Sequence, residues 1–180
     1  EDSTVKLWRV SDGRLITSLD TDIMGIKAGV VTLAFSPNGQ TLASGSGDTS
    51  VSLWRISDGS LITFLPGFRP GEIRYVPFQD QSRAIAFSPD GQILASSRLG
   101  GVSLHRVSDG SLLHSLSNQR SIAIAFSSDG QTLASSSNDG SVKLWRVGDG
   151  QLITSLDHQA SVWTIAFSPD GQTIASGSAD

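Results

Sequence analysis

The feature that most constrains this sequence is its internal repetition. One string, SPNGQTLASGSGD at residues 36–48, recurs with few changes at 88–100, 127–139 and 168–180. A second string, STVKLWRVSDGRLITSL at 3–19, recurs at 49–65, 100–116 and 140–156. A period of about 40 residues is typical of repeat architectures, in which each unit buries its apolar face against its neighbours. The chain is therefore expected to fold as a row of similar units.

Each unit has the pattern of four short β-strands joined by tight turns. In the stretch 121–156, strands are expected at 121–127, 132–136, 141–147 and 151–156. The turns between them contain Asp129-Gly130, Asp139-Gly140 and Asp149-Gly150. Asp-Gly between apolar alternating segments is a strong hairpin signal, and no segment shows the 3.6-residue periodicity of a helix. The sequence predicts an all-β chain with very little helix.

Composition narrows the possible functions. The chain has no cysteine and a formal net charge of −4, and its 180 residues include 19 glycines. No disulfide, thiolate metal site or cysteine nucleophile is possible. The chain also lacks the excess of lysine and arginine that is typical of nucleic-acid-binding proteins. No apolar run reaches the length of about 18 residues that a membrane span needs, and no signal segment is evident, so we expect a cytoplasmic protein. The many serines and glycines recur in register with apolar residues, which indicates turns and small packing residues and not a linker.

The repeated strings resemble the WD-repeat β-propeller family over essentially the whole chain. The resemblance rests on the FSPDG turn, the LASGS hairpin, the VKLW strand and the DGxLxxxL segment. The repeated strings are similar to those of bacterial, particularly cyanobacterial, members of this family. TolB-like propeller repeats share the SPDG turn, but VKLW and VSLW favour WD repeats. The resemblance implies four-stranded antiparallel blades around a central channel.

The repeat phase divides the chain into four blades, one of which is split. Complete blades are expected at about 30–65, 82–116 and 121–156. Residues 4–19 match the third and fourth strands of a unit, and residues 162–177 match the first and second. We expect 4–19 to pair with 162–177, so that residues 1–180 form a single propeller unit.

Three outcomes follow for the split blade. One chain closes as a four-bladed ring, two chains form an eight-bladed homodimer, or the sequence is a piece of a longer propeller. Unpaired strand edges are avoided in proteins, and two-fold symmetry is the commonest oligomer symmetry. The resemblance implies blades shaped for rings larger than four, so the homodimer is the favoured hypothesis.

The resemblance also implies a buried network of histidine, serine or threonine, aspartate and tryptophan. Only the split blade contains all four, and its members are His158, Ser176 or Ser178, Asp180 or Asp2, and Trp8. The equivalent aspartates and tryptophans of complete blades are Asp48, Trp54, Asp139 and Trp145. In the blade at 82–116, Leu99 replaces the aspartate and His105 the tryptophan. Joint loss is expected of a shared network, because a half-satisfied buried set is unfavourable.

No catalytic, metal or cofactor site is expected. The three histidines do not have metal-ligand spacing, and the aspartates before glycine are typical turn residues. The inner strands carry almost no charged groups, with Arg83 as the exception. An enzyme is therefore not predicted, and a small ligand in the central channel is a weaker alternative.

The sequence instead favours a non-catalytic scaffold for protein or peptide partners. The long link at 66–81 contains five residues of the types that dominate binding hot spots, namely Phe68, Arg69, Arg74, Tyr75 and Phe78. Trp163, near the start of an inner strand, is a second candidate, together with Arg83. The remaining alternative is a self-assembling or engineered propeller fragment that has no partner of its own.

Overall fold

The computed structural model describes residues 4–22, 29–66, 84–98, 100–118 and 120–180. These residues form antiparallel β-sheets and contain no helix, which confirms the all-β class. Each sheet is a simple meander in which strands consecutive in sequence are neighbours.

Three sheets have four strands each and are called blades here. Blade I contains β3 (Val30–Phe35), β4 (Thr41–Ser46), β5 (Val51–Arg55) and β6 (Leu61–Leu65). Blade II contains β7 (Ile85–Phe87), β8 (Ile93–Arg98), β9 (Gly101–Arg106) and β10 (Leu112–Ser117). Blade III contains β11 (Ser121–Phe126), β12 (Thr132–Ser137), β13 (Ser141–Arg146) and β14 (Leu152–Asp157).

Two further sheets have two strands each. The leading pair consists of β1 (Thr4–Trp8) and β2 (Leu15–Asp20), and the trailing pair of β15 (Val162–Phe167) and β16 (Ile174–Ser178). In strand order the leading pair matches the outer half of a blade and the trailing pair the inner half.

The turn between the first two strands of each blade is built by its own sequence. In blade II the Ser88 hydroxyl donates to Asp90 at 2.5 Å and accepts from the Ile93 amide at 2.9 Å. Gly91 has a φ of 71°, a conformation that glycine adopts without strain. The Ser88 hydroxyl holds the pKa of Asp90 below its usual value, with help from the Gln92 amide. Ser36, Ser127 and Ser168 make the same pair of hydrogen bonds.

The hydrophobic core lies between successive sheets. Between blades II and III, Val102 and Leu104 of β9 and Leu116 of β10 pack against Leu133 of β12 and Trp145 of β13. Equivalent repeat positions form the cores at the leading-pair junction and between blades I and II. At the trailing pair, Val162 and Ile165 of the inner strand β15 pack with Ala134 and Val142 of blade III. Small side chains on the second strands, such as Ala43, Ala95 and Ala134, are completely buried. They let the sheets approach closely, which explains why the apolar repeats are rich in alanine and serine.

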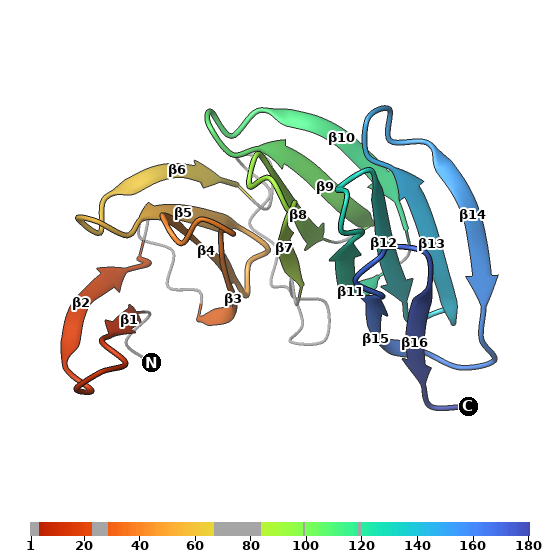
Figure 1. Cartoon of the computed structure of the whole chain (residues 1–180), viewed down its shortest axis with the longest axis horizontal. Coiled ribbons are helices and arrows are strands. Elements are labelled where there is room, and N and C mark those ends of the chain that lie inside the picture. The colour runs from red at the N-terminus through yellow and green to blue at the C-terminus, as the bar shows by residue number, and fades with distance from the viewer. Residues whose placement is uncertain (1–3, 23–28, 67–83, 99, 119) are drawn as a thin grey trace.

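Figure 1 shows the sheets arranged as an open arch. The outer strands β2, β6, β10 and β14 follow its convex side, and inner-strand contacts link β3 to β7, β7 to β11 and β11 to β15. The leading and trailing pairs lie at the two ends of the arch and are separate sheets, so the expected pairing of 4–19 with 162–177 is not formed within this single chain. Closure of the ring stays a prediction.

Candidate interaction surfaces and the polar network

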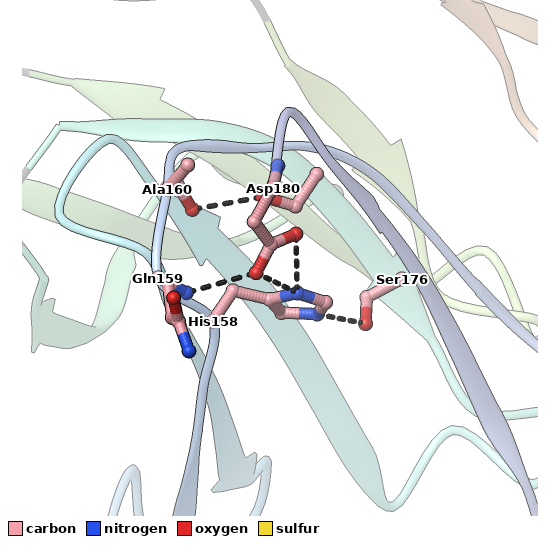
Figure 2. A network of polar contacts seen from close by, with 6 residues as sticks. His158, Gln159, Ala160, Ser176 and Asp180 are labelled. Atoms are coloured by element: carbon pink, nitrogen blue, oxygen red, sulfur yellow. Dashed lines mark hydrogen bonds and ion pairs between the residues drawn. The ribbon is translucent and has the colours of Figure 1, made fainter.

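The polar network of the trailing pair is centred on His158. Figure 2 shows its imidazole between the Ser176 hydroxyl and the Asp180 carboxylate. Nε2 lies 2.8 Å from Ser176 Oγ, and Nδ1 lies 3.3 Å from both oxygens of Asp180. When Nδ1–H donates a hydrogen bond to Asp180, the unprotonated Nε2 accepts a hydrogen bond from the Ser176 hydroxyl. The Gln159 amide also donates to Asp180 at 2.9 Å and is the main cause that lowers the pKa of this carboxyl.

Ser178, the other candidate serine, makes no hydrogen bond to His158 among the described residues. Its hydroxyl donates to the Ala160 carbonyl at 3.0 Å and closes the loop between β14 and β15. Sequence position alone left Ser176 and Ser178 as alternatives because both precede the same turn. Strand alternation does not separate them, because residues two apart face the same side of a strand. The tertiary structure decides, since the Ser176 hydroxyl reaches His158.

In blades I and III the equivalent serine accepts a hydrogen bond from tryptophan. Trp54 Nε1 donates to Ser44 Oγ at 2.8 Å, and Trp145 Nε1 donates to Ser135 Oγ at 2.8 Å. Both serines are fully buried. In blade III, Asn118 adds a second donor, with its Nδ2 2.9 Å from Ser135 Oγ. Sequence reasoning missed Asn118, although it has the same place after an outer strand as His158.

The hairpin aspartates of the complete blades act locally. Asp48 accepts from the amide and the hydroxyl of Ser50, at 3.0 and 2.6 Å. Asp139 accepts from the same groups of Ser141, at 2.9 and 2.7 Å. Burial works to raise the pKa of Asp139, but the hydrogen bonds from Ser141 outweigh it, and the pKa lies below its usual value. These aspartates therefore cap their own hairpins.

Trp8 is the member of the predicted set that the structure does not bring to its partners. Its side chain is 57% exposed at the free end of the leading pair, whereas Trp54 and Trp145 are 5% exposed. Asp2 lies outside the described residues. The described structure thus joins His158, Ser176 and Asp180 and leaves Trp8 at the other end of the arch.

His105 takes the tryptophan position of blade II, opposite Leu94 in the sheet. Its Nδ1 is buried without a hydrogen-bond partner among the described residues. Burial lowers the pKa of His105 below 6.5, and the positive charge of Arg98 adds to the effect. The neutral ring is therefore the favoured form. Leu99 lies outside the described residues.

Trp163 lies on the inner strand β15. It is the most exposed aromatic residue of the inner strands β7, β11 and β15. The register between β15 and β16 shifts between Val162 and Thr164, so Trp163 is at a β-bulge, and its side chain is 53% exposed. Val31 is at the same bulge in blade I and is 37% exposed. Bulges redirect side chains and are common beside functional sites. The candidates Phe68, Arg69, Arg74, Tyr75, Phe78 and Arg83 lie outside the described residues.

The arginine after each tryptophan position has a local partner that the sequence analysis did not assign. The four pairs are Arg9–Asp12, Arg55–Asp58, Arg106–Asp109 and Arg146–Asp149, with separations of 3.3, 3.4, 3.2 and 2.9 Å. All four lie across the turn that leads into the outer strand. Their side chains are about half exposed, so each contributes little to stability.

The described residues contain no group of three or more histidine, aspartate or glutamate side chains placed to hold a metal ion. A shallow cavity of about 230 Å³ is lined by Gly100, Ser117, Asn118 and Lys143. In the described part of the chain, no helix has the length and apolar character required to cross a membrane.

Comparison with known proteins identifies the repeats. The family model described as WD domain, G-beta repeat matches residues 13–55, 110–146 and 150–180, which together cover more than half of the chain. No curated protein matches the sequence. The matched segments contain the turns at 36–39, 127–130 and 168–171, the buried second strands β4 and β12, and most of the polar network described above. The chain belongs to the WD40 repeat family.

Proposed function

We propose that this chain is a non-catalytic scaffold that binds a protein or peptide partner. WD repeats generally mediate protein–protein interaction, and family membership supports this class of function. The observation that carries the proposal is Trp163, which a β-bulge turns outward from an ordered sheet so that half of its surface is exposed. Tryptophan is among the residues most enriched in binding hot spots.

The surroundings of Trp163 suit an apolar, uncharged segment of a partner. The exposed residues beside it on β15, Thr164 and Ala166, are uncharged. β15 is paired to β16 and contacts β11 and β12, so the tryptophan is presented by a backbone with little freedom to lose on binding. A ligand that depends on charge would find few matching groups here.

The experiment selects peptides from a displayed random library against the purified chain. Peptide affinity is then measured for the wild type, Trp163→Ala and the control Ile153→Ala. Ile153 is 49% exposed on the outer strand β14, so it matches the exposure of Trp163 on a different face. We expect Trp163→Ala to weaken binding about tenfold or more and Ile153→Ala to leave it unchanged. Equal affinity for Trp163→Ala, or failure to select any binder, would contradict the proposal.

The homodimer stays a prediction from the repeat phase of the sequence. The cytoplasmic location, the bacterial origin and the contribution of the 66–81 link stay predictions from the sequence. A small ligand in the central channel is a weaker alternative, because the described inner strands carry no charged side chain.

A further inference from the structure

The cavity of about 230 Å³ lies at the junction of blades II and III, in the middle of the arch. Its walls come from both blades and consist of Gly100, Ser117, Asn118 and Lys143. Gly100 belongs to the turn between β8 and β9, Ser117 ends β10, Asn118 follows it, and Lys143 lies on β13. Pockets for drug-sized ligands begin at about 300 Å³, so this cavity has room for a smaller group.

Asn118 brings a buried hydrogen-bond acceptor to this wall. The residue is 2% exposed, and its Nδ2 donates to Ser135 Oγ at 2.9 Å. Its Oδ1 is buried and accepts no hydrogen bond from the described residues. Such an unpaired buried atom costs free energy, and native proteins usually satisfy it with water or a bound group. A group that enters the cavity with an N–H donor would satisfy Oδ1.

Lys143 gives the cavity a positive charge. Asp139, on the hairpin that precedes β13, accepts hydrogen bonds from the amide and hydroxyl of Ser141 and forms no ion pair with the lysine. Lys143 itself makes no hydrogen bond to another described side chain. Its ammonium group is therefore available to an anion that enters the cavity.

The same three repeat positions have the opposite charge where the leading pair meets blade I. There they carry one acid and no base, namely Asp20, Thr21 and Ser52. At the junction of blades II and III the acid is replaced by the hydroxyl of Ser117, and a lysine is added at position 143. The cavity thus departs from the repeat in the direction that favours an anion.

The nearby hairpin of blade II removes a further acid. β8 pairs with β9 as far as Arg98↔Gly101, so its turn has two residues and contains no acid, whereas the longer turn of blade I contains Asp48. Gly100, in the shorter turn, has a φ of 91°, and a Cβ there would contact nothing within 4 Å. This wall of the cavity therefore has neither bulk nor negative charge to repel an anion.

We propose that this cavity binds the terminal carboxylate of a partner peptide, with the carboxylate against Lys143 and Ser117 and the last backbone N–H donating to Asn118 Oδ1. A peptide carboxyl terminus places an anion and a neutral donor on either side of one Cα atom. A free amino acid would instead bring an ammonium group, which Lys143 repels. Capture of a terminal carboxylate is a recurring mode of peptide recognition. The inference rests on the peptide-binding class of the proposed function and uses none of the residues around Trp163.

The first experiment titrates the ¹⁵N-labelled chain with N-acetyl-trialanine and follows the amide signals by NMR. We expect a dissociation constant of about 1 mM, with shifts at Gly100, Ser117 and Asn118. The same peptide with a terminal carboxamide lacks the anion, and acetate lacks the N–H, so each is expected to bind about tenfold more weakly or less. No shifts at these residues, or equal affinity for the carboxamide, would overturn the proposal. Equal affinity for acetate would show an adventitious ion only and would overturn it as well.

The second experiment repeats the titration with variants. Lys143→Met should weaken binding of N-acetyl-trialanine about tenfold, and Lys6→Met, at the same repeat position on β1, should leave it unchanged. Asn118→Leu removes the acceptor, so it should weaken the peptide and leave acetate binding unchanged. Equal effects of the two lysine variants, or an Asn118→Leu variant that affects peptide and acetate alike, would contradict the assigned contacts.

The two proposals fail separately, because Trp163→Ala is expected to leave binding of N-acetyl-trialanine unchanged. Selected peptides that depend on Trp163, together with no binding of N-acetyl-trialanine, would refute the cavity alone. Binding of N-acetyl-trialanine that depends on Lys143, together with selected peptides that ignore Trp163, would refute the Trp163 surface alone.

Discussion

Replacing Ser135 with alanine tests the idea that one buried hydroxyl holds blade III together. Ser135 is fully buried and accepts hydrogen bonds from Trp145 Nε1 at 2.8 Å and from Asn118 Nδ2 at 2.9 Å. Ser135→Ala leaves two buried donors without an acceptor, and each such donor costs about 1–3 kcal/mol. We expect a loss of about 3–4 kcal/mol in the free energy of unfolding.

Ser44→Ala is the matched control within the same chain. Ser44 is fully buried at the same repeat position, but it accepts only from Trp54 among the described residues. The same substitution there orphans one donor, so we expect a loss of about 1–2 kcal/mol. The difference between the two variants isolates the bond from Asn118.

Urea unfolding followed by tryptophan fluorescence and circular dichroism measures both losses. A further variant, Ser135→Ala/Asn118→Leu, removes the second orphaned donor and should recover about 1 kcal/mol relative to Ser135→Ala. If Ser135→Ala destabilises the chain no more than Ser44→Ala does, or if the added Asn118 change recovers nothing, the reasoning about shared acceptors is wrong.

Three further predictions concern single positions. His105→Trp should increase the free energy of unfolding in urea more at pH 5.5 than at pH 7.5. The folded-state pKa of His105 lies below 6.5, so the unfolded ring binds a proton first as the pH falls, and stability that is present above about pH 6.5 is lost below it. An equal gain at both pH values would contradict this. Gly140→Ala should lower the melting temperature much more than Gly13→Ala does. Both glycines have a positive φ, but a Cβ at position 140 would lie 2.6 Å from the His158 carbonyl oxygen, whereas a Cβ at position 13 would contact nothing within 4 Å. Equal effects of the two variants would refute the steric argument. Arg146→Ala should change the free energy of unfolding by no more than about 0.5 kcal/mol, because its ion pair is largely exposed, and a loss several times larger would show that the pair is structurally important.

Much of the fold follows from local pattern. The Ser-Pro-Asp-Gly turns bond within six residues, as Ser88, Asp90 and Ile93 show, so the sequence of one repeat is enough to place them. Strand alternation and repetition likewise predicted the four-stranded sheets, and the resemblance of the repeated strings predicted the WD40 family. The arginine–aspartate pairs across the outer turns are equally local and were accessible from the spacing of Arg146 and Asp149.

The partners in the polar network were less accessible, because they come from different blades. Asn118 follows β10 of blade II but bonds Ser135 of blade III. His158 follows β14 of blade III and selects Ser176 over Ser178 on the next sheet. Such choices depend on how far one sheet is displaced over the next.

By itself, the sequence determined the strands, the turns and the blade repeat of this protein, because those are set by alternation and hydrogen bonds within about 40 residues. Only the tertiary structure decided which repeat positions are buried. Trp8, Trp54 and Trp145 occupy the same place in nearly identical strings, yet the first is exposed and the others are buried. The physical reason is that a blade covers only one side of its neighbour, so burial depends on whether another blade lies beside it.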